Sequence, residues 1–311
     1  MTWWMILLLA LALLLAAVLA GALLLTRMAV GRGVQRKKVW RAPHNQVDTY
    51  GQLRADYEAA KAWWQGISSQ EAWLTSGDGL RLHALWAKAP APGKWALCVH
   101  GYTGRGSNMA YAGQHFYEQG YSLLLPDCRG HGDSEGKTIG MGWPDRLDLL
   151  KWIDWIIARE PQAQIVLYGI SMGAGAVMMA AGEPLPDNVQ AIVEDCGFTS
   201  VWDQFTYQLK ALFGLPPFPM MHLSAWMARR RAGYDFREAS AVAQLKKARV
   251  PVLFIHGGKD RFVPAHMLEQ VYAACAAPKE KLLVAEAGHA EAAHLDPQRY
   301  WGTVFSFLDK A

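Results

Sequence analysis

The residues with the clearest chemical potential surround Ser171. Gly169-Ile170-Ser171-Met172-Gly173 is a G-x-S-x-G pattern that directly follows the apolar run Ile165–Tyr168 and precedes the small-residue run 174–176. In a tight strand–turn–helix connection this pattern exposes the serine hydroxyl above the sheet, and its glycines avoid collisions with the neighbouring strand and helix. The spacing therefore predicts that Ser171 is a nucleophile. A glycine-rich turn with only a structural role is the alternative.

A serine hydroxyl needs a general base to act as a nucleophile. In proteins with this pattern the chain order is serine, acid, histidine. Asp260 follows the apolar run Val250–Ile255, and His289 follows the run Lys281–Ala285. Because parallel strands end at a common edge of the sheet, we expect His289 to accept the proton of Ser171 and Asp260 to orient the imidazole ring.

Two other residues compete for these roles. Asp195 follows an apolar run and could replace Asp260 as the acid, and His294 lies five residues after His289 and could replace it as the base. We favour Asp260 as the acid and His289 as the base.

A serine nucleophile also requires two backbone N–H donors to stabilise the oxyanion. We expect one from Met172, the residue after the nucleophile, and one from the loop 100–104 that follows the apolar run Trp95–Val99. The glycines of this loop allow it to approach Ser171, and the N–H of Tyr102 is the candidate donor. The Tyr102 ring could also line the substrate pocket.

Short apolar runs and helical periodicities alternate from residue 71 onward, which predicts a doubly wound α/β fold. Several later runs are continuously apolar, as expected for a mainly parallel sheet covered on both faces. The predicted strands are Glu71–Ser76, Leu80–Ala87, Trp95–Val99, Tyr121–Leu125, Gln164–Tyr168, Val189–Glu194, Val250–Ile255 and Lys281–Ala285. The predicted helices are Asn108–Gln119, Pro144–Arg159, Met172–Ala181, Pro264–Ala276 and Pro297–Leu308.

Five motifs, taken in this order, resemble those of the α/β-hydrolase family: residues 100–104, 127–134, 169–173, 256–260 and 288–289. The resemblance covers about residues 71–310. It implies an eight-stranded, mostly parallel sheet with helices on both faces and a variable cap, whose place residues 197–245 occupy. It also implies hydrolysis of acyl esters, thioesters or amides through an acyl-enzyme. The 127–134 segment resembles a structural loop, so Asp133 and Ser134 are left out of the site.

The N-terminus carries an apolar segment, Trp3–Leu25, of 23 residues. As a helix this segment is ~34 Å long and covers a bilayer core of ~30 Å. A cleaved signal peptide is the alternative, but no Lys or Arg precedes the run, which also exceeds the usual ~7–15 apolar residues. We therefore predict a transmembrane anchor at 1–26, a basic juxtamembrane linker at 27–46 and a hydrolase domain at 47–311 that contains the 197–245 cap.

Positive charge is concentrated directly after the anchor. The 31 basic side chains, less the six of this segment, leave 25 against 27 acidic ones, so the body carries no basic surplus and a nucleic-acid partner is not expected. The positive-inside rule places the catalytic domain in the cytoplasm, beside a cell membrane crossed once. The six residues are Arg27, Arg32, Arg36, Lys37, Lys38 and Arg41.

Two further segments have alternative interpretations. The helical pattern over Tyr50–Trp64 predicts a helix that packs on the body or lies on the membrane surface. In the cap, Arg229–Arg231 follow the apolar stretch Met220–Met227. They could contact lipid phosphates from a lid, or simply form the last turn of a packed helix that ends at Gly233.

These observations predict a membrane-anchored serine hydrolase that acts on small-molecule or lipid acyl substrates. An acyltransferase or a peptidase with the same residues, and a catalytically silent scaffold that binds a partner at the membrane, are the alternatives. We expect no cofactor and no metal, because no HExxH or CxxC spacing occurs. The cysteines, expected to be reduced, are Cys98, Cys128, Cys196 and Cys275.

Overall fold

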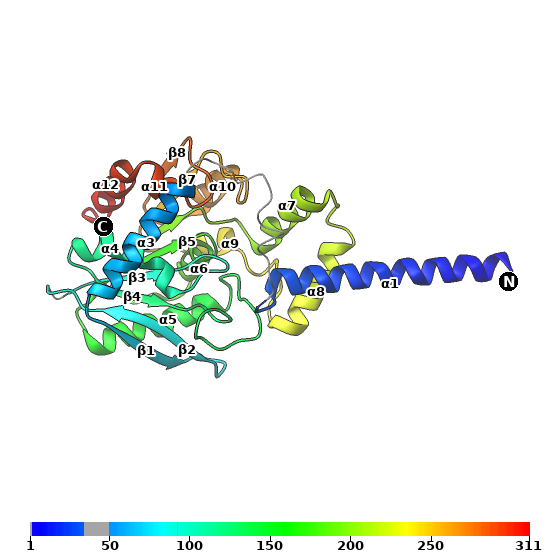
Figure 1. Cartoon of the computed structure of the whole chain (residues 1–311), viewed down its shortest axis with the longest axis horizontal. Coiled ribbons are helices and arrows are strands. Elements are labelled where there is room, and N and C mark those ends of the chain that lie inside the picture. The colour runs from blue at the N-terminus through cyan, green and yellow to red at the C-terminus, as the bar shows by residue number, and fades with distance from the viewer. Residues whose placement is uncertain (1, 34–49, 92) are drawn as a thin grey trace.

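A computed structural model describes residues 2–33, 50–91 and 93–311. Figure 1 shows an α/β body at one end and a long helix, α1 (Trp3–Val30), that projects from it. Within the described residues, eight strands form one sheet in the order β1-β2-β4-β3-β5-β6-β7-β8. The strands are β1 (Ser69–Thr75), β2 (Arg81–Ala87), β3 (Lys94–Val99), β4 (Ser122–Pro126), β5 (Gln164–Ile170), β6 (Val189–Asp195), β7 (Val252–Gly257) and β8 (Lys279–Val284).

The sheet is mostly parallel. β2 pairs antiparallel with both β1 and β4, and every pairing from β4 through β8 is parallel. The carboxyl ends of the parallel strands therefore share one edge, where loops from different parts of the chain meet. The predicted α/β-hydrolase fold class is confirmed.

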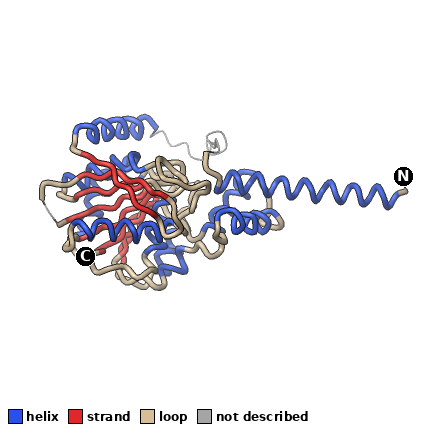
Figure 2. Tube along the Cα trace, turned by 90° about the horizontal axis from the view of Figure 1, so that it is seen from below, coloured by secondary structure: helices blue, strands red, loops and turns tan. Residues whose placement is uncertain are grey.

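Helices cover both faces of the sheet, as Figure 2 shows. Strand β5 illustrates why: Ile165 and Leu167 belong to the core on the side of α5 and α6, whereas Val166 and Tyr168 belong to the core on the side of α4 and α12. Successive side chains of a strand point to opposite faces, so a strand buried on both sides is continuously apolar.

The helices of the body follow the predicted order. They are α3 (Tyr50–Gly66), η2 (Gly106–Met109), α4 (Ala110–Glu118), α5 (Asp145–Arg159), α6 (Met172–Ala180), α10 (His266–Ala274), α11 (Ala292–Leu295) and α12 (Pro297–Leu308). The helix predicted over 108–119 is divided into the 3-10 turn η2 and α4. The side chain of Asn108 accepts the N–H of Arg105 and so starts this turn before the α-helix begins.

The helix α3 packs on the body. Its Ala60 and Trp64 are buried in the core on the α4 and α12 side, and Asp56 lies 2.7 Å from the Nδ1 atom of His294 in α11. Packing on the body, rather than on a membrane surface, is therefore the arrangement of this helix in the structure.

Residues 197–245 contain the cap helices α7 (Val201–Phe213), α8 (Met220–Ala232) and α9 (Ala241–Leu245). Helix α8 packs beside the last turns of α1, where Ser224 Oγ donates to Ala22 O at 3.3 Å and Thr26 Oγ lies 3.4 Å from Ser224 O. A β-carbon on Gly21 would come within 2.8 Å of the Met220 methyl group. Small residues thus let the two helices approach closely.

Helix α1 continues four residues past the predicted boundary at residue 26, and the chain after it is joined to the body. The Val30 carbonyl accepts the N–H of Ile139 at 2.8 Å. The Arg32 guanidinium donates to Gly132 O at 2.9 Å and to Ser134 O at 2.8 Å. The first residues of the predicted linker are therefore packed structure, and residues 34–46 of that linker lie outside the described residues.

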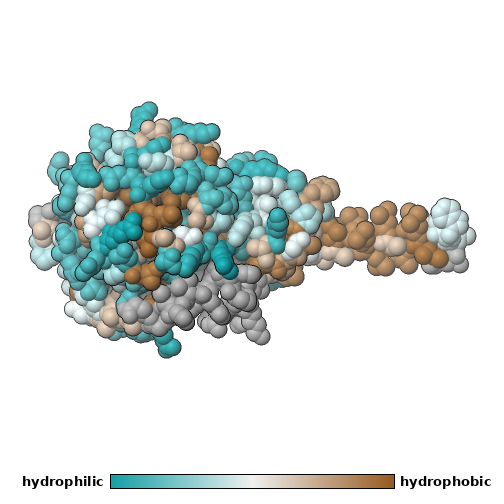
Figure 3. All heavy atoms as spheres, turned by 90° about the horizontal axis from the view of Figure 1, so that it is seen from above, coloured by the Kyte–Doolittle hydropathy of each residue, from teal (hydrophilic) through white to brown (hydrophobic). Residues whose placement is uncertain are grey.

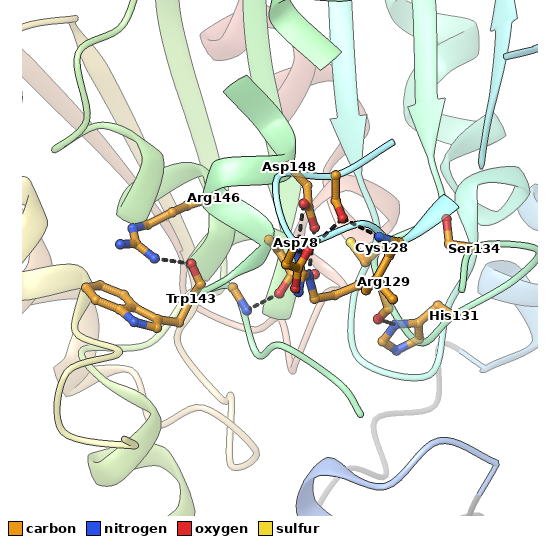
Figure 4. A network of polar contacts seen from close by, with 12 residues as sticks. Asp78, Cys128, Arg129, His131, Ser134, Trp143, Arg146 and Asp148 are labelled. Atoms are coloured by element: carbon orange, nitrogen blue, oxygen red, sulfur yellow. Dashed lines mark hydrogen bonds and ion pairs between the residues drawn. The ribbon is translucent and has the colours of Figure 1, made fainter. Parts of the chain in front are cut away.

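A polar network, buried except at Asp78, holds the loop that Arg32 contacts (Figure 4). Arg129 Nε donates to Asp148 Oδ2 at 2.8 Å, and its Nη1 donates to Asp78 Oδ2 at the same distance. Ser134 Oγ donates to the Asp127 carbonyl at 2.6 Å and accepts the N–H of His83 at 2.8 Å. The contacts of this loop are structural.

Candidate active site

The turn between β5 and α6 holds Ser171 in an unusual backbone conformation. Its φ is 57° and its ψ is −112°, which costs free energy for a residue with a side chain. A β-carbon at Gly169 would lie 2.3 Å from Gly173 O, and one at Gly173 would lie 2.1 Å from Val99 O. Both glycines are therefore required by close packing, and the turn presents the Ser171 hydroxyl at the sheet edge.

The structure brings the predicted nucleophile, base and acid together. His289 Nε2 lies 2.8 Å from Ser171 Oγ, and His289 Nδ1 lies 2.7 Å from Asp260 Oδ2. The three side chains come from the β5–α6 turn, the loop after β8 and the loop after β7, respectively. This is the geometry in which an imidazole can remove the serine proton while a carboxylate fixes its tautomer.

The Asp260 carboxylate is built to stay ionised. Its Oδ1 accepts the backbone N–H groups of Phe262 and Val263, each at 2.8 Å. Burial alone raises the pKa of Asp260, but the neighbouring imidazoles of His289 and His256 and the hydrogen bonds to them lower that pKa well below its usual value. A permanent negative charge beside His289 would stabilise an imidazolium formed there.

The two competing residues have other partners. Asp195 Oδ2 accepts the hydroxyl of Tyr300 at 2.8 Å, and His294 faces Asp56. Each contact holds a helix against the body. The structure therefore places neither Asp195 nor His294 in the hydrogen-bonded series Ser171–His289–Asp260.

The loop after β3 passes close to the nucleophile. A β-carbon at Gly101 would lie 3.4 Å from Ser171 Cβ, and Tyr102 and Met172 line the pocket beside Ser171. The Tyr102 hydroxyl lies 2.9 Å from the carbonyl oxygen of Met28 and 2.5 Å from that of Ala29. The predicted oxyanion loop is thus tied to the end of α1.

The pocket at Ser171 is mostly apolar and has about 320 Å³ of empty space. Helix α7 forms one wall through Gln204, Phe205 and Gln208. The Gln204 and Gln208 amides donate to Phe262 O at 2.8 and 2.6 Å. The cap is therefore fixed to the loop that carries Asp260.

Sequence reasoning missed the contribution of α1 and of these two glutamines. Gln204 and Gln208 stand four residues apart, which places them on one helix face, but nothing in the sequence names Phe262 as their partner. The contact of Tyr102 with Met28 and Ala29 joins segments more than 70 residues apart.

Two groups of three potential metal ligands occur among the described residues: Cys196, Asp260 and His289, and separately His83, Asp127 and Asp133. The closest atoms of each group are already engaged, with imidazole–carboxylate distances of 2.7 and 2.9 Å.

Comparisons with known proteins agree with this fold. A family model described as "alpha/beta hydrolase fold" matches residues 95–217. The uncharacterized protein YqkD of Bacillus subtilis is 30% identical over 68% of this chain and 70% of its own length. The chain belongs to the α/β-hydrolase family.

Solved structures show the same architecture. The esterase Pf2001 of Pyrococcus furiosus superposes with a TM-score of 0.65 at 20% identity, over 79% of this chain and 92% of the esterase. An acylaminoacyl peptidase of Pyrococcus horikoshii superposes with a TM-score of 0.59 at 17% identity, over 80% of this chain and 43% of the peptidase. At these identities the likeness shows the fold alone.

Proposed function

We propose that this protein is a membrane-anchored serine hydrolase that cleaves carboxylic esters of hydrophobic acids. The observation that carries the proposal is the continuous chain Ser171–His289–Asp260, with 2.8 and 2.7 Å between the interacting atoms. The apolar pocket at Ser171 supports a hydrophobic acyl group.

In the first half-reaction Ser171 Oγ attacks the ester carbonyl carbon, and its proton moves to His289 Nε2. The oxyanion that forms is stabilised by the N–H groups of Tyr102 and Met172. The carbon–oxygen bond to the alcohol then breaks, and the alcohol leaves with the proton from His289. Asp260 keeps the charged imidazole in place throughout.

In the second half-reaction a water molecule attacks the acyl-enzyme and gives one proton to His289. The bond between the acyl carbon and Ser171 Oγ breaks, and the serine regains its proton from His289. The carboxylic acid leaves, and the enzyme returns to its starting state.

Helix α1 serves as the membrane anchor in this proposal. Within the described residues it is the one helix long and apolar enough to cross a membrane, and Figure 3 shows its apolar side chains projecting beyond the body. A signal peptide has the same composition. The polar contacts of Thr26 with α8 and of Arg32 with the 132–136 loop favour a helix that stays with the mature protein.

The cap helix α8 has features that fit a position next to the membrane. Arg229, Arg230 and Arg231 are exposed in its last turn, before the left-handed Gly233. Thr26 lies 4.0 Å from Met227, and it follows Trp3 by ~34 Å along α1. The arginines would therefore lie outside a ~30 Å hydrocarbon core, at the level of the lipid head groups.

The catalytic proposal is tested with purified full-length protein in detergent and nitrophenyl esters of increasing acyl length. We expect turnover that is lost in Ser171→Ala and reduced by several orders of magnitude in His289→Ala, with both variants folded. Hydrolysis that persists in Ser171→Ala would refute the proposal.

The anchor and its orientation are tested separately. We expect the protein to stay in the membrane fraction after alkaline extraction, to retain its N-terminal residues, and to keep a C-terminal reporter on the cytoplasmic side. A mature chain that begins after residue 25, or a reporter active only outside the cytoplasm, would contradict this part.

A further inference from the structure

A second hollow lies between α1 and the cap. Its empty space, part of which is open to solvent, is about 470 Å³. Helix α1 contributes Leu25, Met28 and Ala29 to its wall, and the facing wall comes from α7 and α8.

The lining of this hollow favours a hydrocarbon. Among its lining residues, Gln208 and Ser224 carry polar side chains. The Gln208 amide donates to Phe262 O, and the Ser224 hydroxyl donates to Ala22 O. Because these donors already have partners, the hollow favours binding of an apolar ligand over a polar one. An apolar ligand removes apolar surface from water and leaves no polar group without a hydrogen-bond partner.

The hollow adjoins the pocket at Ser171. Phe205 and Gln208 of α7 line both spaces. An acyl chain whose carbonyl carbon lies at Ser171 would pass these two residues to reach the hollow beside α1.

The other end of the hollow opens at the tip of the cap. Phe213 lines the hollow and is also 46% exposed. The next residues of the tip include Leu215 and Phe218, which are 39% and 71% exposed. Large exposed apolar side chains grouped at one tip mark a surface that meets an apolar partner.

The length of α1 identifies that partner as the bilayer. Met220, at the start of α8, contacts Gly21, and Gly21 follows Trp3 by ~27 Å along the helix. If Trp3 lies at the far interface, the tip of the cap reaches the near edge of a ~30 Å hydrocarbon core. The hollow then opens to lipid rather than to water.

We propose that this hollow, bounded by α1 and the cap, is the acyl-chain site of the enzyme and that membrane lipid esters fill it directly from the bilayer. The inference rests on the proposed hydrolase function and assigns its substrate class: long-chain carboxylic esters of lipids. In this proposal helix α1 both anchors the protein in the membrane and forms part of the substrate site.

The test compares nitrophenyl palmitate with nitrophenyl butyrate, using full-length protein in mixed micelles. Leu25→Trp places a bulky ring in the hollow. Leu24→Trp is the matched control, because Leu24 is 60% exposed on the same helix. For Leu25→Trp we expect the palmitate-to-butyrate ratio of kcat/KM to fall about tenfold or more, the effect of leaving roughly two methylenes unburied. For Leu24→Trp the ratio should match that of wild type.

Leu212→Trp repeats the test from the facing wall, on α7, in case the first variant does not fold. A wild type that hydrolyses butyrate but not palmitate, or folded Leu25→Trp and Leu212→Trp proteins that keep the wild-type ratio, would overturn the acyl-chain site while leaving the hydrolase function standing. Loss of all ester hydrolysis in the wild type would refute the hydrolase function, and the acyl-chain site with it.

Discussion

Two buried aspartates lie near the ends of neighbouring strands, and they allow a matched test of how His289 is activated. Asp260 accepts from His289, whereas Asp195 accepts from Tyr300. We expect Asp260→Asn to lower kcat for ester hydrolysis about 10³- to 10⁴-fold. We expect Asp195→Asn to change it less than about threefold, because an asparagine oxygen can still accept the Tyr300 hydroxyl.

The reason for the large effect is the proton on the imidazole. In Asp260→Asn the side-chain oxygen can keep the N–H groups of Phe262 and Val263, which leaves the amide NH₂ facing His289 Nδ1. The imidazole must then carry its proton on Nε2, where it cannot accept the proton of Ser171. The loss of the carboxylate also removes the charge that stabilises the imidazolium.

The assay is steady-state hydrolysis of nitrophenyl butyrate by full-length protein, with thermal unfolding of each variant as the control for folding. If Asp195→Asn lost more activity than Asp260→Asn, with both proteins folded, our assignment of the acid would be wrong.

Three further predictions concern the surroundings of this site. Tyr102→Phe removes the hydroxyl that donates to the end of α1, so it should lower the free energy of unfolding by about 1–3 kcal/mol. Because the oxyanion loop loses this contact, the variant should also lower kcat more than it changes KM. An unchanged melting temperature would contradict the expected loss of stability. Gly173→Ala would place a methyl group 2.1 Å from Val99 O, so it should abolish labelling by a serine-directed probe or prevent folding, and a fully active variant would show that the turn is wrongly described. Burial raises the pKa of Glu194 from 4.5 to about 8, so the folded state holds a proton that the unfolded state releases between these values. Wild-type stability should therefore fall as pH rises through this range, by at most about 1.4 kcal/mol per pH unit from this group. The Glu194→Gln variant lacks this titrating group. Denaturant midpoints at pH 5 and pH 8.5 should therefore show that the variant becomes more stable, relative to wild type, as the pH rises. A stability difference that does not change with pH would contradict the role of Glu194.

The succession of strands along the chain, and the turn that carries Ser171, could be predicted because local hydropathy and local contacts determine them. Gly169 and Gly173 are required by contacts within the turn and with the adjacent strand. Asp260 and His289 could be found because each follows a strand end, and parallel strands place such ends together. Strand boundaries were less predictable. β7 extends to Gly257 because His256 and Gly257 still pair with β8, a contact invisible in local hydropathy.

The contribution of α1 to the site could not be predicted. A run of apolar residues indicates a membrane span by length alone, and it does not show that Leu25 and Met28 face a hollow while Leu24 faces outward. That asymmetry comes from the packing of α8 against Ala22 and Thr26. For the same reason the end of the helix at Val30, beyond the predicted boundary at residue 26, follows from tertiary contacts.

The most direct test of the account is labelling of full-length protein with a fluorophosphonate probe, which reacts only with an activated serine. We predict stoichiometric labelling of the wild type at Ser171, no labelling of Ser171→Ala and greatly slowed labelling of His289→Ala. A folded wild-type protein that does not react, or one that is labelled at another serine, would contradict the claim that Ser171, His289 and Asp260 form a working catalytic site.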